Sequence, residues 1–242
     1  MNPHAIFELR RYRLRPGGRT ALTELFDAAF VEPQEALGMR IEGEFWDRDD
    51  PDAFVWVRSF ADWDSRARAL QAFYGGPVWA AHGAAANATM LNSDNVLLLK
   101  PAGALAPFAH SLPRAEEKAR SQATGLVVAS VCSLAPGKEA GFAELFSERA
   151  CPILRQAGAR IDAMFVSERG ANNFPRLPVR EGETVFVWFE CHADEASQTR
   201  HREQLARITE WTDDVQPRLD RQCWRPIKVS YLTPTSRSLC AW

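Results

Sequence analysis

Residues 54–63 read FVWVRSFADW, and residues 186–195 read FVWFECHADE. Each stretch is rich in β-branched and aromatic residues and then passes through Ala-Asp into a sequence of helical character. This pattern is typical of a buried strand followed by a capped helix. Because it occurs twice in one chain, it indicates an internal duplication.

Two constant offsets relate the halves of the chain. An offset of 120 maps the turn at 134–137 (LAPG) onto the turn at 14–17 (LRPG). An offset of 132 maps Trp188 onto Trp56 and Trp211 onto Trp79. The change of offset implies an insertion of about 12 residues, which we place in the segment 170–183 of the second hairpin. A long hairpin loop of this kind is a lid, an interface arm or a tolerated insertion.

The predicted elements follow one order in both halves. In the first half, strands are expected at 6–14, 40–47, 54–60 and 95–100. Helices are expected at 20–31 and 62–74, followed by a helical piece that carries Trp79 and His82. The order β-α-β-β-α-β is that of a ferredoxin-like unit. We therefore predict an α+β fold of two tandem ferredoxin-like units, with a first domain at 1–101, a linker at 102–122 and a second, diverged domain at 123–242.

Strand alternation divides the first sheet into two faces. The apolar face is predicted to take the helices, and it comprises Phe7, Leu9, Ile41, Phe45, Val55 and Val57. The opposite face is predicted to close a barrel against the second half, and it comprises Glu8, Arg10, Tyr12, Arg40, Glu42, Glu44, Trp46, Phe54, Trp56 and Arg58. Because Arg58 and Glu190 are equivalent and opposite in charge, we expect them to meet across a pseudo-twofold axis.

The segment 7–12 (FELRRY), followed by Pro16-Gly17, Trp56 in a strand, an arginine-containing helix and Trp79, resembles the NIPSNAP family. The resemblance is best over 4–101 and weaker over 123–233. It implies the dimeric α/β-barrel superfamily, whose ferredoxin-like units pair into a barrel, and the tandem arrangement is similar to bacterial members with two such domains. That superfamily includes cofactor-free monooxygenases, haem-dependent enzymes, isomerases and lyases. The resemblance thus implies a small-molecule pocket without fixing a reaction.

The candidate site residues lie on the predicted barrel face of the first half and on the helical piece after it. His82 and Tyr12 are candidates for proton transfer. Candidates for ligand binding are Arg10, Glu44, Trp46, Trp56, Arg58 and Trp79, because arginine suits a carboxylate or phenolate and the rings would form walls. The alternatives are a core Trp79, a surface His82 and a charged set that forms internal salt bridges. Since the second half has lost most of this set, we expect the pocket in the first half.

Composition and spacing exclude several classes of protein. A formal net charge of −2 gives no reason to expect a nucleic-acid or membrane partner. The five widely spaced cysteines predict reduced thiols in a cytoplasmic protein. His4, His110, His192 and His201 show no metal-ligand spacing, so neither a metal nor a cofactor is predicted. The helical arginines Arg66, Arg68, Arg200, Arg202 and Arg207 are interpreted as a solvated face.

The sequence therefore favours a NIPSNAP-type protein that binds or converts a small aromatic or anionic molecule in a barrel pocket, as a cofactor-free monooxygenase or isomerase. The alternative is a non-enzymatic binding or interaction module whose barrel interior is packed. A homodimer is expected in either case.

Overall fold

The computed structural model describes residues 4–109 and 125–240. In this part of the chain, nine strands form one sheet in the order β3-β2-β9-β6-β8-β7-β5-β1-β4, and an additional β3–β1 pairing closes it into a barrel. The strands are β1 (Ile6–Leu14), β2 (Arg40–Asp47), β3 (Ala53–Phe60), β4 (Met90–Asn92), β5 (Val96–Pro101), β6 (Leu126–Ser133), β7 (Arg160–Ser167), β8 (Val185–His192) and β9 (Lys228–Pro234). All of their pairings are antiparallel. Strand β5 pairs with β7, and β9 pairs with β2, so the two halves of one chain close the barrel together.

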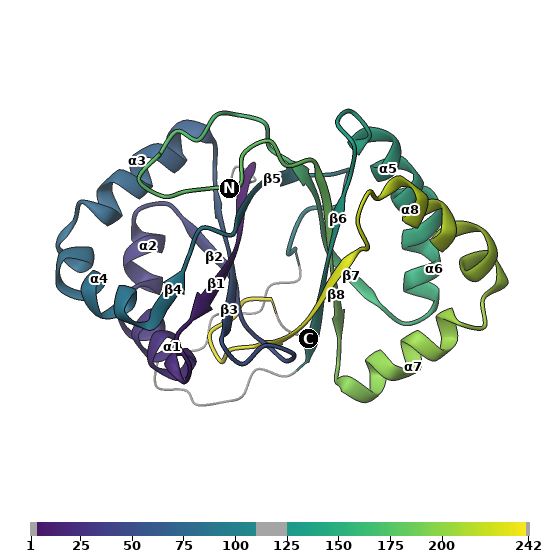
Figure 1. Ribbon diagram of the computed structural model, residues 1–242, viewed down its shortest axis with the longest axis horizontal. Coiled ribbons are helices and arrows are strands. Elements are labelled where there is room, and N and C mark those ends of the chain that lie inside the picture. The colour runs from purple at the N-terminus through teal and green to yellow at the C-terminus, as the bar shows by residue number, and fades with distance from the viewer. Residues whose placement is uncertain (1–3, 110–124, 241–242) are drawn as a thin grey trace.

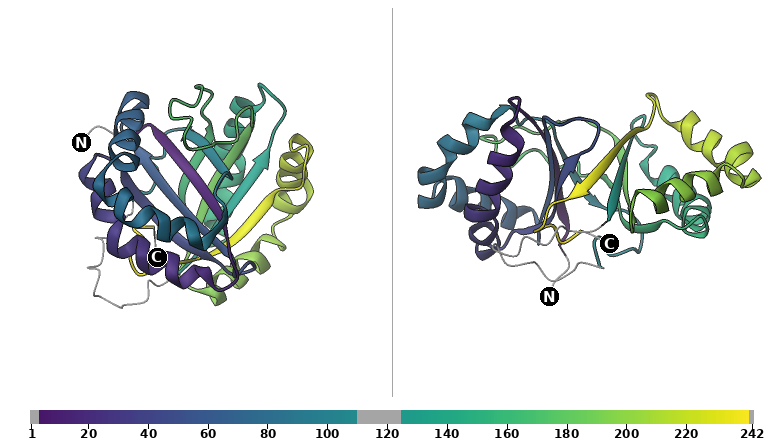
Figure 2. Two further views of the ribbon diagram at one scale, coloured as in Figure 1. Left: turned by 60° about the vertical axis from the view of Figure 1, so that its left-hand side comes forward. Right: turned by 90° about the horizontal axis from the view of Figure 1, so that it is seen from below.

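The helices lie in two layers on opposite sides of the barrel (Figures 1 and 2). The first layer is formed by α1 (Gly18–Ala29), α2 (Val31–Ala36), α3 (Trp63–Tyr74) and α4 (Pro77–Thr89). The second is formed by α5 (Glu139–Leu145), the π-helical turn η1 (Phe146–Ala150), α6 (Cys151–Gln156), α7 (Glu195–Leu205), the π-helical turn η2 (Glu210–Val215) and α8 (Gln216–Gln222). Asp62 and Asp194 cap α3 and α7 by accepting hydrogen bonds from the backbone N–H of Ser65 and Ser197.

The predicted order of elements agrees with the structure, apart from the short helix α2 and the short strand β4, which were not expected. In each half the first strand pairs with the third and the last, β1 with β3 and β5, and β6 with β8 and β9. The start of the predicted linker is packed, because Ala102 donates to Met164 O and Phe108 donates to Asp162 O through their backbone N–H groups. Residues 110–122 of that linker lie outside the described residues.

The predicted assignment of the two sheet faces is wrong. The apolar residues Phe7, Leu9, Phe45, Val55 and Val57 fill the barrel interior, where they pack with apolar residues of the second half such as those of β6 and β8. The mixed face, with Tyr12, Phe54 and Trp56, packs under α1 to α4. A barrel of this size is filled by side chains, so the uniformly apolar face packs inside it, whereas the helix-covered layer holds long charged side chains that form ion pairs.

Ile41 is the exception to this inversion, since it does pack under the helices. The register of β2 against β3 shifts between Ile41 and Gly43, which moves Ile41 to the other face. The expected contact of Arg58 with Glu190 does not form. Arg58 bonds to Glu8 and Gln34 in its own half, and Glu190 bonds to Trp188 and His201 in the other.

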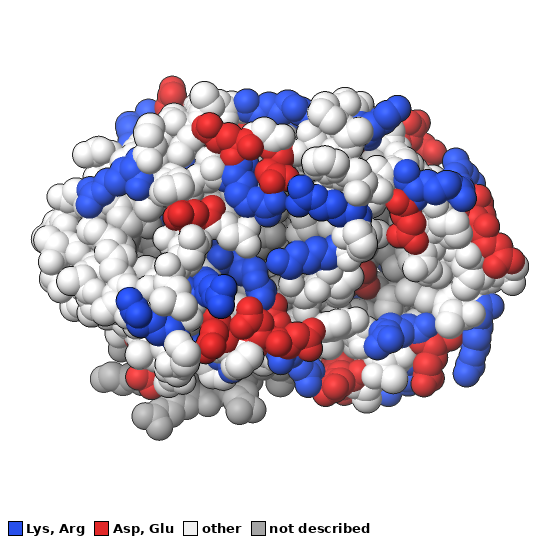
Figure 3. All heavy atoms as spheres, in the orientation of Figure 1, with Lys and Arg blue, Asp and Glu red and all other residues white. Residues whose placement is uncertain are grey.

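Acidic and basic side chains are mixed on the face of the molecule in Figure 3, and basic ones gather across its middle. Arg11, Arg180 and Lys228 line one narrow space at an end of the barrel. Arg11 is paired there with Asp47 at 2.5 Å and with Asp50 at 2.9 Å. Among the described residues, no helix combines the length and the apolar character needed to cross a bilayer.

Candidate functional site

A cluster of four charged side chains lies buried under the first helical layer. The Glu8 carboxylate on β1 contacts three guanidinium groups, those of Arg10, Arg58 and Arg66, each at 2.7 Å. All four side chains are at most 1% exposed. We call these residues the Glu8 cluster.

Hydrogen bonds to neutral groups complete the cluster. Arg10 donates to the Tyr12 hydroxyl at 2.9 Å, and Arg58 donates to Gln34 Oε1 at 3.0 Å. Burial alone would raise the pKa of Glu8, but the guanidinium groups of Arg58, Arg10 and Arg66 outweigh it and hold this pKa well below its usual range. The cluster is therefore a buried network in which one carboxylate is paired with three guanidinium groups.

The insertion predicted in the second hairpin covers this cluster. We call residues 170–183 the insertion arm, and Figure 1 shows it in green, running across to α3. Asn173 accepts from Arg66 Nη1 at 2.6 Å and donates to the backbone oxygen of Trp63 at 2.7 Å. Phe174 is buried against Tyr74, with their rings stacked 5.9 Å apart. The arm thus contacts the first half of its own chain.

The structure brings some of the predicted site residues together and separates others. Arg10, Tyr12, Trp56 and Arg58 meet in or beside the Glu8 cluster, with Arg10 and Arg58 each within 5.5 Å of the Trp56 ring. Arg66, which we expected on a solvated face, is a buried member of that cluster. The sequence analysis missed its role.

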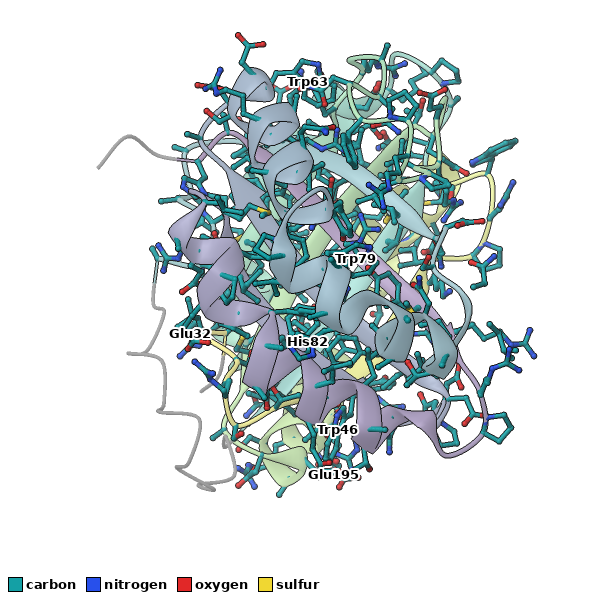
Figure 4. The ribbon with its side chains drawn as sticks, turned by 90° about the vertical axis from the view of Figure 1, so that its left-hand side faces the viewer. Glu32, Trp46, Trp63, Trp79, His82 and Glu195 are labelled. Carbon is teal, nitrogen blue, oxygen red and sulfur yellow. The ribbon has the colours of Figure 1, made fainter. Side chains whose placement is uncertain are left out.

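The remaining predicted residues lie apart from the cluster's carboxylate. Trp46 donates a hydrogen bond from Nε1 to Thr23 Oγ1. Glu44 is buried, and its backbone carbonyl oxygen accepts a hydrogen bond from the backbone N–H of Thr235. Trp79 packs on Phe30, Phe73 and Tyr74, while His82 is exposed and contacts the Phe30 ring at 6.4 Å. Figure 4 shows Trp79 and His82 along α4, with Trp46 and Trp63 toward opposite ends of the view. The binding and proton-transfer roles of all these residues stay predictions.

A cavity of about 890 Å³ lies under the second helical layer. We call it the second-half cavity. It is enclosed by the outer face of β6, β8 and β9 and by α7, η2 and α8. Its aromatic lining is formed by Trp188, Trp211, Trp224 and Tyr231. Trp224 is 65% exposed, so one side of the cavity opens to solvent.

The cavity exists because shorter side chains replace the long ones of the first half. At the two offsets of the duplication, four lining residues correspond to members or neighbours of the Glu8 cluster. They are Val128, Ser130, Gln198 and Ala206, in place of Glu8, Arg10, Arg66 and Tyr74. The strand registers agree with this correspondence, since Val128 pairs with Glu190 as Glu8 pairs with Arg58.

Glu190 and His201 provide the buried ionisable groups of the cavity wall. Trp188 Nε1 donates to Glu190 Oε1 at 2.7 Å, and His201 Nε2 lies 3.3 Å from Glu190 Oε2. His192, behind them on β8, places its Nε2 3.7 Å from the same oxygen. Burial alone would raise the pKa of Glu190, but the adjacent side chains of His192, His201 and Trp188 outweigh burial and lower it to about 2.

Sequence reasoning missed this group, although a signal was present. Glu190 and His192 alternate on one strand and so share a face. The Asp194 cap fixes the start of α7, which returns His201 toward that face nine residues after His192. Spacing rules that consider only short motifs do not detect a strand-plus-helix set of this kind.

Solved structures show the class of fold. A candidate monooxygenase from Fusobacterium nucleatum is 13% identical and has a TM-score of 0.60. The match covers 97% of this chain and 94% of that one. An anthrone oxidase-like protein is 12% identical and has a TM-score of 0.63. The match covers 96% of this chain and 92% of that one. A candidate monooxygenase from Lactobacillus acidophilus is 9% identical and has a TM-score of 0.57. The match covers 96% of this chain and 94% of that one. The chain therefore has the mixed α/β fold of these proteins, a closed antiparallel barrel flanked by helices.

The match to a sequence family covers a smaller part of the chain than the structural matches do. Residues 7–104 match the NIPSNAP family model, which confirms the resemblance seen in the sequence over this part of the chain. No curated protein matches the chain by sequence.

Proposed function

We propose that this NIPSNAP-type chain binds a small, largely aromatic molecule in the second-half cavity. The observation that carries the proposal is the cavity itself, because about 890 Å³ is within the usual size of ligand pockets and the lining combines aromatic rings with few buried polar groups. Glu190 and His201 would hold the polar end of the ligand by hydrogen bonds. Trp188, Trp211 and Tyr231 would contact its rings.

We further propose that the chain is a tandem of ferredoxin-like units, at 1–101 and 123–242, of which the second keeps a pocket between its sheet and its helices. The equivalent strand pairings of the two halves support this division. The reaction class that fits is an oxygenation or isomerisation of an aromatic compound, and the names of the structural neighbours support the first of these.

One observation favours the rival, non-enzymatic function. The barrel interior is filled by apolar side chains of both halves, as a packed interaction module would require. The second-half cavity lies outside that interior, between sheet and helices, so a packed barrel and a ligand pocket are compatible in this chain. Ligand binding therefore has to be tested at the cavity and not at the barrel.

The test uses a planar aromatic phenol, 1,8-dihydroxyanthraquinone, titrated into the full chain by calorimetry. Ala206→Tyr introduces the side chain that Tyr74 supplies in the first half, and it should weaken binding at least about tenfold by filling the cavity mouth. Ala84→Tyr, the same change on the exposed surface of α4, is the matched control and should leave the affinity unchanged. Absence of saturable binding, or equal affinity in both variants, would favour the rival.

A further inference from the structure

We propose that Glu190, His192 and His201 form a binding site for one divalent transition-metal ion at the wall of the second-half cavity. Their ligand atoms all lie within 4.8 Å of one another, and all three residues are buried. Two imidazoles and one carboxylate are ligands that Fe²⁺, Zn²⁺ and Mn²⁺ share. This inference revises the expectation of no metal and no cofactor, which rested on sequence spacing alone.

The distance from Glu190 to His201 fits a shared ion, and the distance from Glu190 to His192 is slightly longer than such an ion requires. Two atoms that each lie about 2.1 Å from one metal ion are about 3.0–3.5 Å apart for angles near 90–110°. Glu190 Oε2 is 3.3 Å from His201 Nε2 and 3.7 Å from His192 Nε2. The two imidazole rings are 5.0 Å apart between centroids, so both can face one point. Small rotations of the side chains would complete the coordination.

The surroundings of His201 and Glu190 already orient both groups as metal ligands. His201 Nδ1 is 3.1 Å from the backbone oxygen of Ala157, so this nitrogen carries the proton and donates. A histidine that donates from Nδ1 can bind a metal ion through Nε2, and here Nε2 faces the Glu190 carboxylate at 3.3 Å. Trp188 holds the other carboxylate oxygen at 2.7 Å. Such outer hydrogen bonds are typical of metal-bound histidine and carboxylate.

His192 supplies an independent observation. Its side chain is fully buried, and within the described residues neither ring nitrogen has a hydrogen-bond partner. A buried polar group without a partner costs about 1–3 kcal/mol, so native proteins rarely keep one without a reason. A metal ion bound through Nε2 would provide that reason.

The position of the site leaves room for exchangeable ligands. Glu190 and His201 line the second-half cavity, so an ion between them would have coordination positions open toward it. The inference depends on the proposed function only for what would occupy those positions. In the first half, the equivalent residues are Arg58, Phe60 and Ala69, which cannot bind a metal ion. The site would therefore be particular to the second half.

The test is a titration of the metal-free full chain with Zn²⁺ alone, by calorimetry and by elemental analysis after dialysis. We expect one bound equivalent, and a higher melting temperature with Zn²⁺. His192→Phe, which introduces the first-half residue, and Glu190→Gln should each lower the affinity about 100-fold or more. Cobalt substitution should give a spectrum of nitrogen and oxygen ligands without a thiolate charge-transfer band.

Cys240→Ser is the matched control, because Asp162, Cys191 and Cys240 are the other described group with suitable spacing for a metal. This variant should bind as the wild type does. No saturable binding, binding that survives both His192→Phe and Glu190→Gln, or loss in Cys240→Ser would overturn the inference. A metal-free chain that binds the aromatic probe but no Zn²⁺ would contradict only the metal site, and the reverse result would contradict only the proposed function.

Discussion

The layer between sheet and helices is filled in the first half of the molecule and hollow in the second. In the first half, Glu8, Arg10, Arg58 and Arg66 occupy this layer with 2.7 Å ion pairs. In the second half, the equivalent layer forms a cavity of about 890 Å³ and contains the buried carboxylate of Glu190 with two histidines. The same arrangement of strands and helices therefore supports either a charged core or a pocket, depending on the length of a few side chains.

The hairpins β2–β3 and β7–β8 also differ, and they cover the helical layers of the two halves unequally. The insertion arm reaches the start of α3 near Trp63 and adds the buried ring of Phe174. The first hairpin has no such insertion, and it reaches the start of α7 through one exposed ion pair, Arg48 with Glu195 at 2.7 Å. One half is thus covered by an arm from the other, while the second-half cavity stays open.

The largest expected effect comes from removing the central charge of the filled half. Glu8→Gln leaves three buried guanidinium groups without their carboxylate, so it should lower the free energy of unfolding by about 4 kcal/mol. Denaturation in urea measures this change. Glu195→Gln, which breaks the exposed ion pair to Arg48, is the control and should have almost no effect. Equal effects of the two changes would show that the Glu8 cluster does not stabilise the first half.

The second largest effect is expected from a substitution in the insertion arm, and it tests whether the arm covers the Glu8 cluster. Phe174→Ala removes a buried ring that stacks on Tyr74, and it should cost about 3 kcal/mol of unfolding free energy. The variant should also expose the Glu8 cluster to water, which amide hydrogen exchange at Trp63 to Tyr74 would detect as faster exchange. A loss of stability without faster exchange in α3 would mean that the arm is not a cover for the cluster.

Acid should weaken the filled half through Glu8. The pKa of Glu8 lies below its ordinary value of 4.5 in the folded chain, so its stabilising contribution is fully present above pH 4.5 and is lost as the pH falls toward the folded value. At about 1.4 kcal/mol per pH unit, the wild type should lose about 2 kcal/mol of its advantage over Glu8→Gln between pH 4.5 and 3. Urea denaturation of both proteins over this range measures the difference. A constant difference would contradict the lowered pKa.

The fold could be predicted from the sequence because its signals are local and repeated. The strands at 6–14 and 40–47 and the Asp62 cap each follow from alternation or from a single capping residue. Which face of the sheet is inside could not be obtained in this way. Alternation gives two faces, but only closure of the barrel decides that the apolar one, with Phe7 and Val57, is inside. Ile41 lies on the opposite face because of a bulge that alternation does not reveal.

The site was harder to predict because a pocket is defined by missing atoms. The charged residues of the first half were predicted to form a binding site, and the structure shows Arg10 and Arg58 paired with Glu8. The loss of these groups in the second half was visible in the sequence, and it marks the hollow region. Glu190, His192 and His201 come from a strand and a helix, and only the tertiary fold brings them within 4.8 Å.

The smallest expected effect is the change in the free energy of unfolding when a side chain is added in the second-half cavity. Ala206→Tyr places a ring where the second-half cavity has space, so it should change the free energy of unfolding by less than about 1 kcal/mol, whereas a ring forced into a packed layer typically costs 1–3 kcal/mol. Urea denaturation without ligand measures this. A larger loss would mean that this layer is packed in solution, and the two halves would then differ in charge alone. A small loss, together with weaker binding of the aromatic probe, would show that the space belongs to a ligand.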